Sequence, residues 1–266
     1  MPDATRRVTV AARTFNVVVG RHDGFWGTCE QGWETSTFEV LASRLGAAST
    51  FVDVGAWIGP MTLVAAACGA RVLAYEPDPA AADELAANVA VNPGFDTLIS
   101  IERVALWTSA GHRALRGGPV GLGESMSSFS GRSGRVGSTN VATVDAREAA
   151  RSWPADSLVK IDVEGAEYRL LPRLRPFIAE HRPTMVVSVH GYDVRASLAG
   201  WPSPVRRVVH HVRHASRAVP LLWALRGYGA TRASDHRRPQ WHEVSKLALT
   251  LRMWERELLL ERRRQG

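Results

Sequence analysis

Four residues in one short region combine a spacing and a chemistry that suit a nucleoside. Asp53, Gly55 and Gly59 lie in FVDVGAWIGP (51–60), which begins as an apolar strand and ends in a glycine-bearing turn. Such a turn lets a ligand approach the backbone, and the helix that follows offers free N–H donors. The next apolar run ends in Glu76, 21 residues after Gly55, where a carboxylate can accept hydrogen bonds from both ribose hydroxyls.

Phosphate-binding versions of this turn fit the sequence poorly. A dinucleotide site would require G-x-G-x-x-G, but Trp57 and Pro60 stand where the second and third glycines belong. A P-loop would require Gly-Lys-Ser/Thr, which the sequence lacks. A nucleoside ligand without a phosphate site points to S-adenosylmethionine.

A second set of polar residues follows two later apolar runs. Asp162 and Glu164 come at the end of SLVKIDV (157–163), and His190 follows TMVVSV (184–189). The carboxyl ends of parallel strands meet at one edge of a sheet, where ligands gather. We expect Asp162 and Glu164 to hold a base or an acceptor hydroxyl, or to bind a divalent ion, and a neutral His190 to accept a proton. The alternatives are charge compensation at a helix N-terminus and an ordinary packed histidine.

The elements that must position these residues alternate between strands and helices. Apolar, β-branched runs without polar alternation indicate strands buried on both faces of a parallel sheet: 50–54, 71–75, 98–106, 157–163 and 184–189. Helices are predicted after Pro60 and after the N-cap Asp78. The fold class is therefore α/β, a doubly wound Rossmann-like sheet that is mostly parallel. Alternating residues predict an N-terminal β-hairpin over 6–20 and an antiparallel final strand over 243–252.

We interpret residues 1–266 as a single domain with four parts. These are an N-terminal hairpin and cap (1–40), a ligand-binding core (48–192), a basic helical insertion (193–226), and terminal strands with a C-terminal helix (227–266). Within the core, the Gly- and Ser-rich stretch 117–140 is expected to be a mobile loop that closes over the substrate. Within the insertion, residues 205–217 combine apolar residues at helical spacing with several Arg and His residues. These basic residues either bind an anionic acceptor or form a solvent-exposed face of the helix.

Composition narrows the class of protein. The net charge is +7, from 33 basic and 26 acidic residues, but the basic excess after residue 200 has no nucleic-acid motif beside it. Nucleic acid is therefore not the favoured partner. No apolar run approaches the roughly 20 residues that span a bilayer, and no secretory signal is recognised. Cys29 and Cys68 lack metal-type spacing, so we expect a cytoplasmic protein with reduced thiols and no membrane association.

Several segments together resemble class I S-adenosylmethionine-dependent methyltransferases of the FkbM type. The resemblance covers roughly residues 30–190: GWETSTFEVL, FVDVGAWIGPMT, AYEPDP, RVALW and VKIDVEGAEYRLL match the family's segments in order. The last, similar to K-I-D-V-E-G-x-E, is the most specific. Two positions depart from the pattern, since Trp57 replaces a usual Asn and Ser188 a usual Glu.

The resemblance implies a set of cofactor residues. Glu34 would meet the amino group of S-adenosylmethionine, Pro77 would follow the ribose-binding acid, and Val104 and Ala105 would lie near the adenine. Asp162 would border both cofactor and acceptor. Trp57 either lines the pocket or packs beneath the loop, and Trp26 and Trp33 either form an aromatic wall for the acceptor or pack in the core.

The expected activity is methyl transfer to a hydroxyl of a small molecule, a sugar or a secondary-metabolite alcohol, with anionic or glycosylated acceptors included. Enzymes of this fold that methylate nucleic-acid amines typically have N/D-P-P-Y/F after the fourth strand, where this chain reads IDVEGAEY. Two alternatives stay open, namely an RNA- or nucleotide-directed methyltransferase and a non-catalytic binding domain. The sequence leaves metal dependence and oligomeric state undecided.

Overall fold

The computed structural model describes most of the chain, namely residues 4–129, 136–190, 216, 219–226, 228–232 and 256–262. The expected strand over 243–252 and nearly all of the basic segment 205–217 lie outside these residues.

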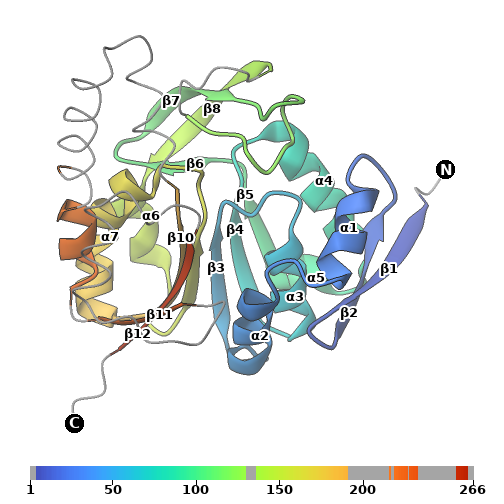
Figure 1. Cartoon of the computed structure of the whole chain (residues 1–266), viewed down its shortest axis with the longest axis horizontal. Helices are drawn as coiled ribbons and strands as arrows, with labels where there is room; N and C mark the ends of the chain where they lie inside the picture. The colour runs from blue at the N-terminus through green and yellow to red at the C-terminus, as the bar shows by residue number, and fades with distance from the viewer. Residues whose placement is uncertain are drawn as a thin grey trace, which may run out of the picture.

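A seven-stranded sheet forms the centre of the molecule (Figure 1), in the order β11-β12-β10-β9-β3-β4-β5. Its five parallel strands run from β10 to β5. Their bounds are Thr50–Val54 (β3), Arg71–Tyr75 (β4), Ile99–Glu102 (β5), Leu158–Ile161 (β9) and Thr184–Val189 (β10). The predicted parallel sheet is therefore confirmed.

Helices cover both faces of this sheet, which explains why its strands lack polar alternation. In β3, Val52 and Val54 pack in one apolar cluster with the side chains of α7, whereas Phe51 packs in the other with α2 and α3. Figure 1 shows α6 and α7 on one side and α1 to α5 on the other. The helices are Asp23–Glu30 (α1), Thr35–Arg44 (α2), Pro60–Ala67 (α3), Pro79–Ala90 (α4), Phe95–Leu98 (α5), Ala146–Ala149 (α6) and Glu167–His181 (α7), with a 3₁₀ turn at Ala150–Ser152.

The predicted helix starts are confirmed. Pro60 occupies the first turn of α3, where its missing N–H costs nothing. The Asp78 carboxylate caps α4 by accepting a hydrogen bond from Ala80 N at 3.0 Å. Both helices thus begin directly after a strand of the parallel sheet and present their N-termini at its carboxyl edge.

The N-terminal hairpin is confirmed, and one predicted strand is corrected. Strands Thr5–Val10 (β1) and Arg13–Val18 (β2) pair antiparallel. The run 98–106 is divided between β5 and a short strand, Ala105–Trp107 (β6), of a separate sheet. There β6 pairs with Ser138–Asp145 (β8), which pairs in turn with Gly111–Arg116 (β7). The sequence prediction was wrong because both pieces are apolar and two residues separate them.

The C-terminal part differs from expectation in one respect. Arg256–Arg262 (β12) pairs antiparallel with β10, and Tyr228–Arg232 (β11) pairs antiparallel with β12, so that β11 again runs in the direction of the parallel strands. The final strand is therefore antiparallel as expected, but it lies at 256–262, within the part of the chain (227–266) where we expected terminal strands followed by a C-terminal helix. The apolar run Leu258–Leu260 lies against buried β10, and such sheet pairing overrides a helical preference. Among the described helices, none has the length and apolarity needed to cross a membrane.

Candidate active site

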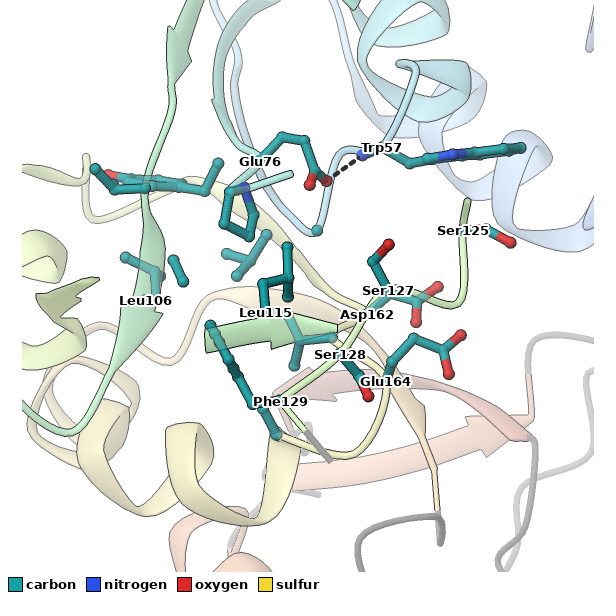
Figure 2. Close-up of a pocket in the computed structure, with 18 of the residues that line it drawn as sticks. Trp57, Glu76, Leu106, Leu115, Ser125, Ser127, Ser128, Phe129, Asp162 and Glu164 are labelled. Atoms are coloured by element: carbon teal, nitrogen blue, oxygen red, sulfur yellow. Dashed lines mark hydrogen bonds between the residues drawn. The ribbon is translucent and has the colours of Figure 1, made fainter. Parts of the chain in front are cut away.

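A cavity opens at the carboxyl edge of the parallel strands, where the topology places ligands. It encloses about 600 Å³ of space, part of it open to solvent. Its wall is formed by the residues after β3, β4 and β9, by β6 and by the segment after β7 (Figure 2). Of the twelve residues that we expected at the site, eight line this cavity: Gly55, Trp57, Glu76, Pro77, Val104, Ala105, Asp162 and Glu164.

The turn after β3 depends on glycine at position 55. Gly55 has a φ of +84°, and a Cβ there would lie 1.8 Å from the backbone oxygen of Asp162. Two cavity-lining loops therefore touch at this point, and any side chain would drive them apart. Gly59 has a φ of +97° and begins α3, where a Cβ would lie 2.4 Å from Leu85 Cδ1.

Glu76 lies at the end of β4 with both carboxylate oxygens fixed. Oε2 accepts a hydrogen bond from Trp57 N at 2.7 Å and Oε1 accepts one from Asp78 N at 2.8 Å. Burial raises the pKa of this carboxyl to about 7, against the opposing effect of the two backbone donors. Each oxygen keeps a lone pair, so the carboxylate is oriented for two further donors from a ligand.

The cavity has a polar side and an apolar side. In Figure 2, Ser127, Asp162 and Glu164 lie on one side, Leu106, Leu115 and Phe129 on the other, and Glu76 lies at the top between the two groups. Val104 and Ala105 also contribute to the wall. An apolar region beside an anchored carboxylate suits a planar base attached to a ribose.

Trp57 is one of the residues that line the cavity, while its ring packs against neighbouring aromatic residues, so both expected positions have support. Its φ of +51° is a left-handed conformation that asparagine tolerates better than tryptophan. The ring packs edge-on against Phe25 and His22, and Nε1 donates a hydrogen bond to Gly123 O at 2.7 Å. The indole thus makes tertiary contacts that an asparagine side chain is too short to make.

Residues 122–129, which we call the strap, run along the cavity. The buried Asp78 carboxylate holds the strap, since its Oδ2 accepts hydrogen bonds from Gly123 N at 2.7 Å and Ser127 Oγ at 2.8 Å. Arg21 binds the strap's outer side through Leu122 O and Glu124. The expectation that the glycine- and serine-rich loop lies over the site agrees with this position, but no sequence signal indicated that Asp78 would hold it.

Asp53 is fully buried and does not line the cavity, contrary to expectation. Its Oδ2 accepts a hydrogen bond from Thr62 Oγ1 at 2.7 Å, and its Oδ1 lies 3.2 Å from Lys160 Nζ. Lys160 also donates to Gly55 O at 2.7 Å. Burial opposes the charge of Lys160, but Asp53, Asp162 and Glu34 outweigh it and hold the pKa of this lysine above its usual value. Asp53 therefore acts on the site by fixing Lys160 and the glycine turn.

Lys160 was missed as a site residue, although it lies in the most specific sequence motif. The signal available was a lysine inside a strand of otherwise apolar residues, LVKI. A buried cation in such a place requires partners.

His190 is surrounded by carboxylates. Its Nδ1 lies 3.0 Å from Glu167 Oε1 and 3.7 Å from Asp162 Oδ1, and its Nε2 lies 3.8 Å from Glu164 Oε1. Burial alone would lower the pKa of the imidazole, but the three carboxylates raise it to about 10. A raised pKa favours the imidazolium at neutral pH, which counts against the expected role of a neutral His190 as the base.

The remaining candidates lie outside the cavity wall. Glu34 precedes α2 in a left-handed conformation, and its charge contributes to the raised pKa of Lys160, which places it near the glycine turn. Trp26 is fully buried and packs edge-on against Phe15, so it is a core residue and forms no acceptor wall. Ser188 is buried within β10.

The sheet order, the glycine turn and the acid after the second parallel strand define a class I methyltransferase fold. The family model of the methyltransferase FkbM domain matches residues 53–206, more than half of the sequence, and the chain belongs to this family. A comparison with curated proteins finds no match.

Three solved structures are similar to the chain at low identity. The methyltransferase FkbM from Methylobacillus flagellatus KT is 16% identical with a TM-score of 0.46, and the match covers 82% of this chain but only 44% of that one. A putative transferase from Pyrococcus horikoshii is 11% identical with a TM-score of 0.39 and coverages of 97% and 71%. A geranyl diphosphate methyltransferase in complex with SAM is 12% identical with a TM-score of 0.41 and coverages of 99% and 100%.

Proposed function

We propose that the protein is an S-adenosylmethionine-dependent O-methyltransferase that acts on a hydroxyl of a small molecule, a sugar or a secondary-metabolite alcohol. The observation that supports this most directly is the cavity of this methyltransferase-family chain, which has an anchored Glu76 at one wall and Asp162 and Glu164 at another.

The residues present fit the cofactor. Gly55 lets the turn after β3 lie against the loop of Asp162, Glu76 offers two oriented acceptors for ribose hydroxyls, and Val104, Ala105 and Leu106 offer an apolar surface for adenine. When bound, S-adenosylmethionine would supply an electrophilic methyl group on a sulfonium, with a neutral thioether as the leaving group.

The chain's own contribution is to orient the acceptor and receive its proton. An aliphatic hydroxyl is a poor nucleophile until a base takes its hydrogen. Asp162 and Glu164 line the cavity and are the candidates for this base or for hydrogen-bonding the hydroxyl, whereas the raised pKa of His190, which lies beside both carboxylates, makes it a weaker candidate. The strap closes one side of the cavity and limits the entry of water.

The RNA-directed alternative has less support. The cavity wall near Asp162 is acidic, and a phosphodiester backbone requires cations along its path. Two free cysteines in the described part of the chain fit a cytoplasmic location.

Calorimetric titration with S-adenosylhomocysteine, followed by transfer of labelled methyl groups to a panel of glycosides, polyketide alcohols and RNA, tests the proposal. We expect binding and label on a hydroxyl of one small-molecule class. Label on RNA alone would favour the nucleotide-directed alternative, and tight cofactor binding without turnover on any member of a broad panel would favour a binding domain.

A further inference from the structure

Three side chains with metal-binding atoms converge at the polar wall of the cavity. Asp162 and Glu164 follow β9, His190 follows β10, and each offers one ligand atom such that all three atoms lie within 4.8 Å of one another. Their side chains are mostly buried, with 23%, 14% and 12% of their surface exposed. The cluster therefore lies at the cavity and is largely removed from bulk water.

A fourth residue fixes the orientation of the imidazole. Glu167 is completely buried, and its Oε1 lies 3.0 Å from His190 Nδ1. The Glu167 carboxylate accepts hydrogen bonds from Val163 N at 3.1 Å and from Gly165 N at 3.0 Å, so its position is set by the backbone. This contact makes Nδ1 the donor nitrogen and turns Nε2 toward Glu164. A histidine that ligates a metal is usually held in this way by a carboxylate on its other nitrogen.

We propose that Asp162, Glu164 and His190 bind a divalent cation of the Mg²⁺ or Mn²⁺ kind, with Glu167 as the positioning residue. Around a six-coordinate ion with bonds of about 2.1 Å, ligand atoms lie roughly 3 to 4 Å apart. The 3.8 Å distance from His190 Nε2 to Glu164 Oε1 falls in this range. The 3.7 Å contact of Asp162 Oδ1 is with Nδ1, so the Asp162 carboxylate would have to rotate toward Nε2 to complete the set, whose ligand atoms already lie within 4.8 Å of one another. The two carboxylates are the hard oxygen ligands that such metals prefer, and His190 adds one nitrogen ligand.

A bound ion would have a role in catalysis only if the protein is the methyltransferase proposed above, and in this respect the inference rests on the proposed function. Three protein ligands leave positions open toward the cavity, where an acceptor hydroxyl can bind, and the ion helps that hydroxyl lose its proton to solvent. The ion would bind Nε2 of His190, while Nδ1–H stays with Glu167. Lys160 Nζ lies 4.0 Å from Asp162 Oδ2, on the other side of that carboxylate.

The site can be tested without S-adenosylmethionine by titrating the chelator-treated full chain with Mn²⁺. Electron paramagnetic resonance measures the binding, because the signal of the free ion is lost when the ion is bound. We expect one Mn²⁺ per chain and at least 10-fold weaker binding for Asp162→Asn and for Glu164→Gln. Glu167→Gln, which changes no ligand, should weaken binding by about 10- to 100-fold.

Glu124→Gln is the matched control, because Glu124 also lines the cavity but lies on the strap beside Arg21. It should bind Mn²⁺ as the unchanged protein does. The proposal would be overturned if no Mn²⁺ bound at millimolar concentration, or if Glu164→Gln and Glu124→Gln bound Mn²⁺ with equal affinity. The cluster would then be a histidine paired with carboxylates and no metal site. If Asp162→Asn fails the thermal melting check for folding, Glu164→Gln decides. Titration of the metal-free protein with S-adenosylhomocysteine tests the proposed function separately, because Gly55, Glu76, Val104 and Ala105, which would hold the ribose and the base, lie outside this cluster.

Discussion

At the scale of single residues, Glu76 has the most demanding environment of the cofactor residues. Its carboxylate is buried, accepts two backbone hydrogen bonds and has a pKa raised to about 7 by desolvation. The protein therefore keeps a group that is costly to ionise at the place where a ribose would bind. Costly polar groups of this kind are characteristic of functional sites.

We expect nucleoside affinity to increase between pH 6 and pH 8, because ionised Glu76 is the stronger acceptor for ribose hydroxyls. Methylthioadenosine is a suitable probe for calorimetry, since it has no amino-acid group that titrates. Glu76→Gln should bind it about 10- to 100-fold more weakly at pH 8 and should lose the pH dependence. Affinity that is unchanged by Glu76→Gln would mean that the ribose binds elsewhere.

The same pKa predicts a pH effect on stability. Because the folded-state pKa is raised from 4.5 to about 7, the folded state binds the proton more tightly than the unfolded state. The contribution of Glu76 to the free energy of unfolding should therefore fall as pH rises from about 4.5 to about 7 and stay constant above that. Urea unfolding of the unchanged protein and of Glu76→Gln at several pH values measures this difference. A difference that is flat across this range would contradict the raised pKa.

Gly55 offers a test of the contact between the two cavity loops. Gly55→Ala should destabilise the fold by more than the roughly 1–2 kcal/mol of a left-handed alanine, because its Cβ would overlap Asp162 O. Gly94→Ala is a close control, since Gly94 has a φ of +86° against +84° for Gly55, but no atom within 4 Å of the new Cβ. Urea unfolding of both variants gives the comparison. Equal losses would show that the loops do not touch as described.

At the scale of elements, the strap connects two features that look independent in the sequence. Asp78 caps α4 through Oδ1 and binds the strap through Oδ2, and Trp57 Nε1 binds the same strap at Gly123. The loop after β4 and the strap are therefore held by the same carboxylate, that of Asp78. The tryptophan that departs from the family pattern adds a second point of attachment.

Asp78→Ser should separate the two roles of this residue. Serine can still cap α4, but its hydroxyl is too short to reach the strap. We expect hydrogen exchange of the Gly123 amide to quicken in Asp78→Ser, with α4 exchange nearly unchanged. Trp57→Phe should produce a smaller increase at the strap, because it removes one bond and keeps the ring contacts with Phe25 and His22. Unchanged exchange at Gly123 in both variants would contradict these attachments.

At the scale of the whole molecule, the cofactor site and the basic segment 205–217 differ in the sign of their charged residues. The cavity wall contains several carboxylates, whereas the net charge of +7 arises largely after residue 200. The basic segment lies outside the described residues, so its role is a prediction from sequence alone.

Neutralising Arg206, Arg207 and Arg213 together should raise the acceptor KM and leave the dissociation constant of the cofactor unchanged, because these residues lie outside the cofactor motifs. Steady-state kinetics with the acceptor and calorimetry with S-adenosylhomocysteine measure the two quantities. A triple variant with unchanged KM would indicate a solvated face.

The sequence by itself determined the parallel sheet, the N-terminal hairpin, the starts of α3 and α4, and eight of the residues that line the cavity. These features depend on local signals, namely apolar runs, proline and capping residues, glycine at a turn and an acid at the end of a strand. Such signals lie within a few residues of the structure that they specify.

Only the tertiary structure decided how the polar residues meet. Asp53 lies against Lys160 in the interior, and Asp78 accepts hydrogen bonds from the strap. His190 lies among the carboxylates of Asp162, Glu164 and Glu167. The pKa of His190 is raised by carboxylates that lie 23 to 28 positions away in the sequence. The residues next to His190 in the chain therefore could not predict this shift. Likewise, residues 256–262 became a strand because β10 offered an edge to pair with, which is a property of the assembled sheet.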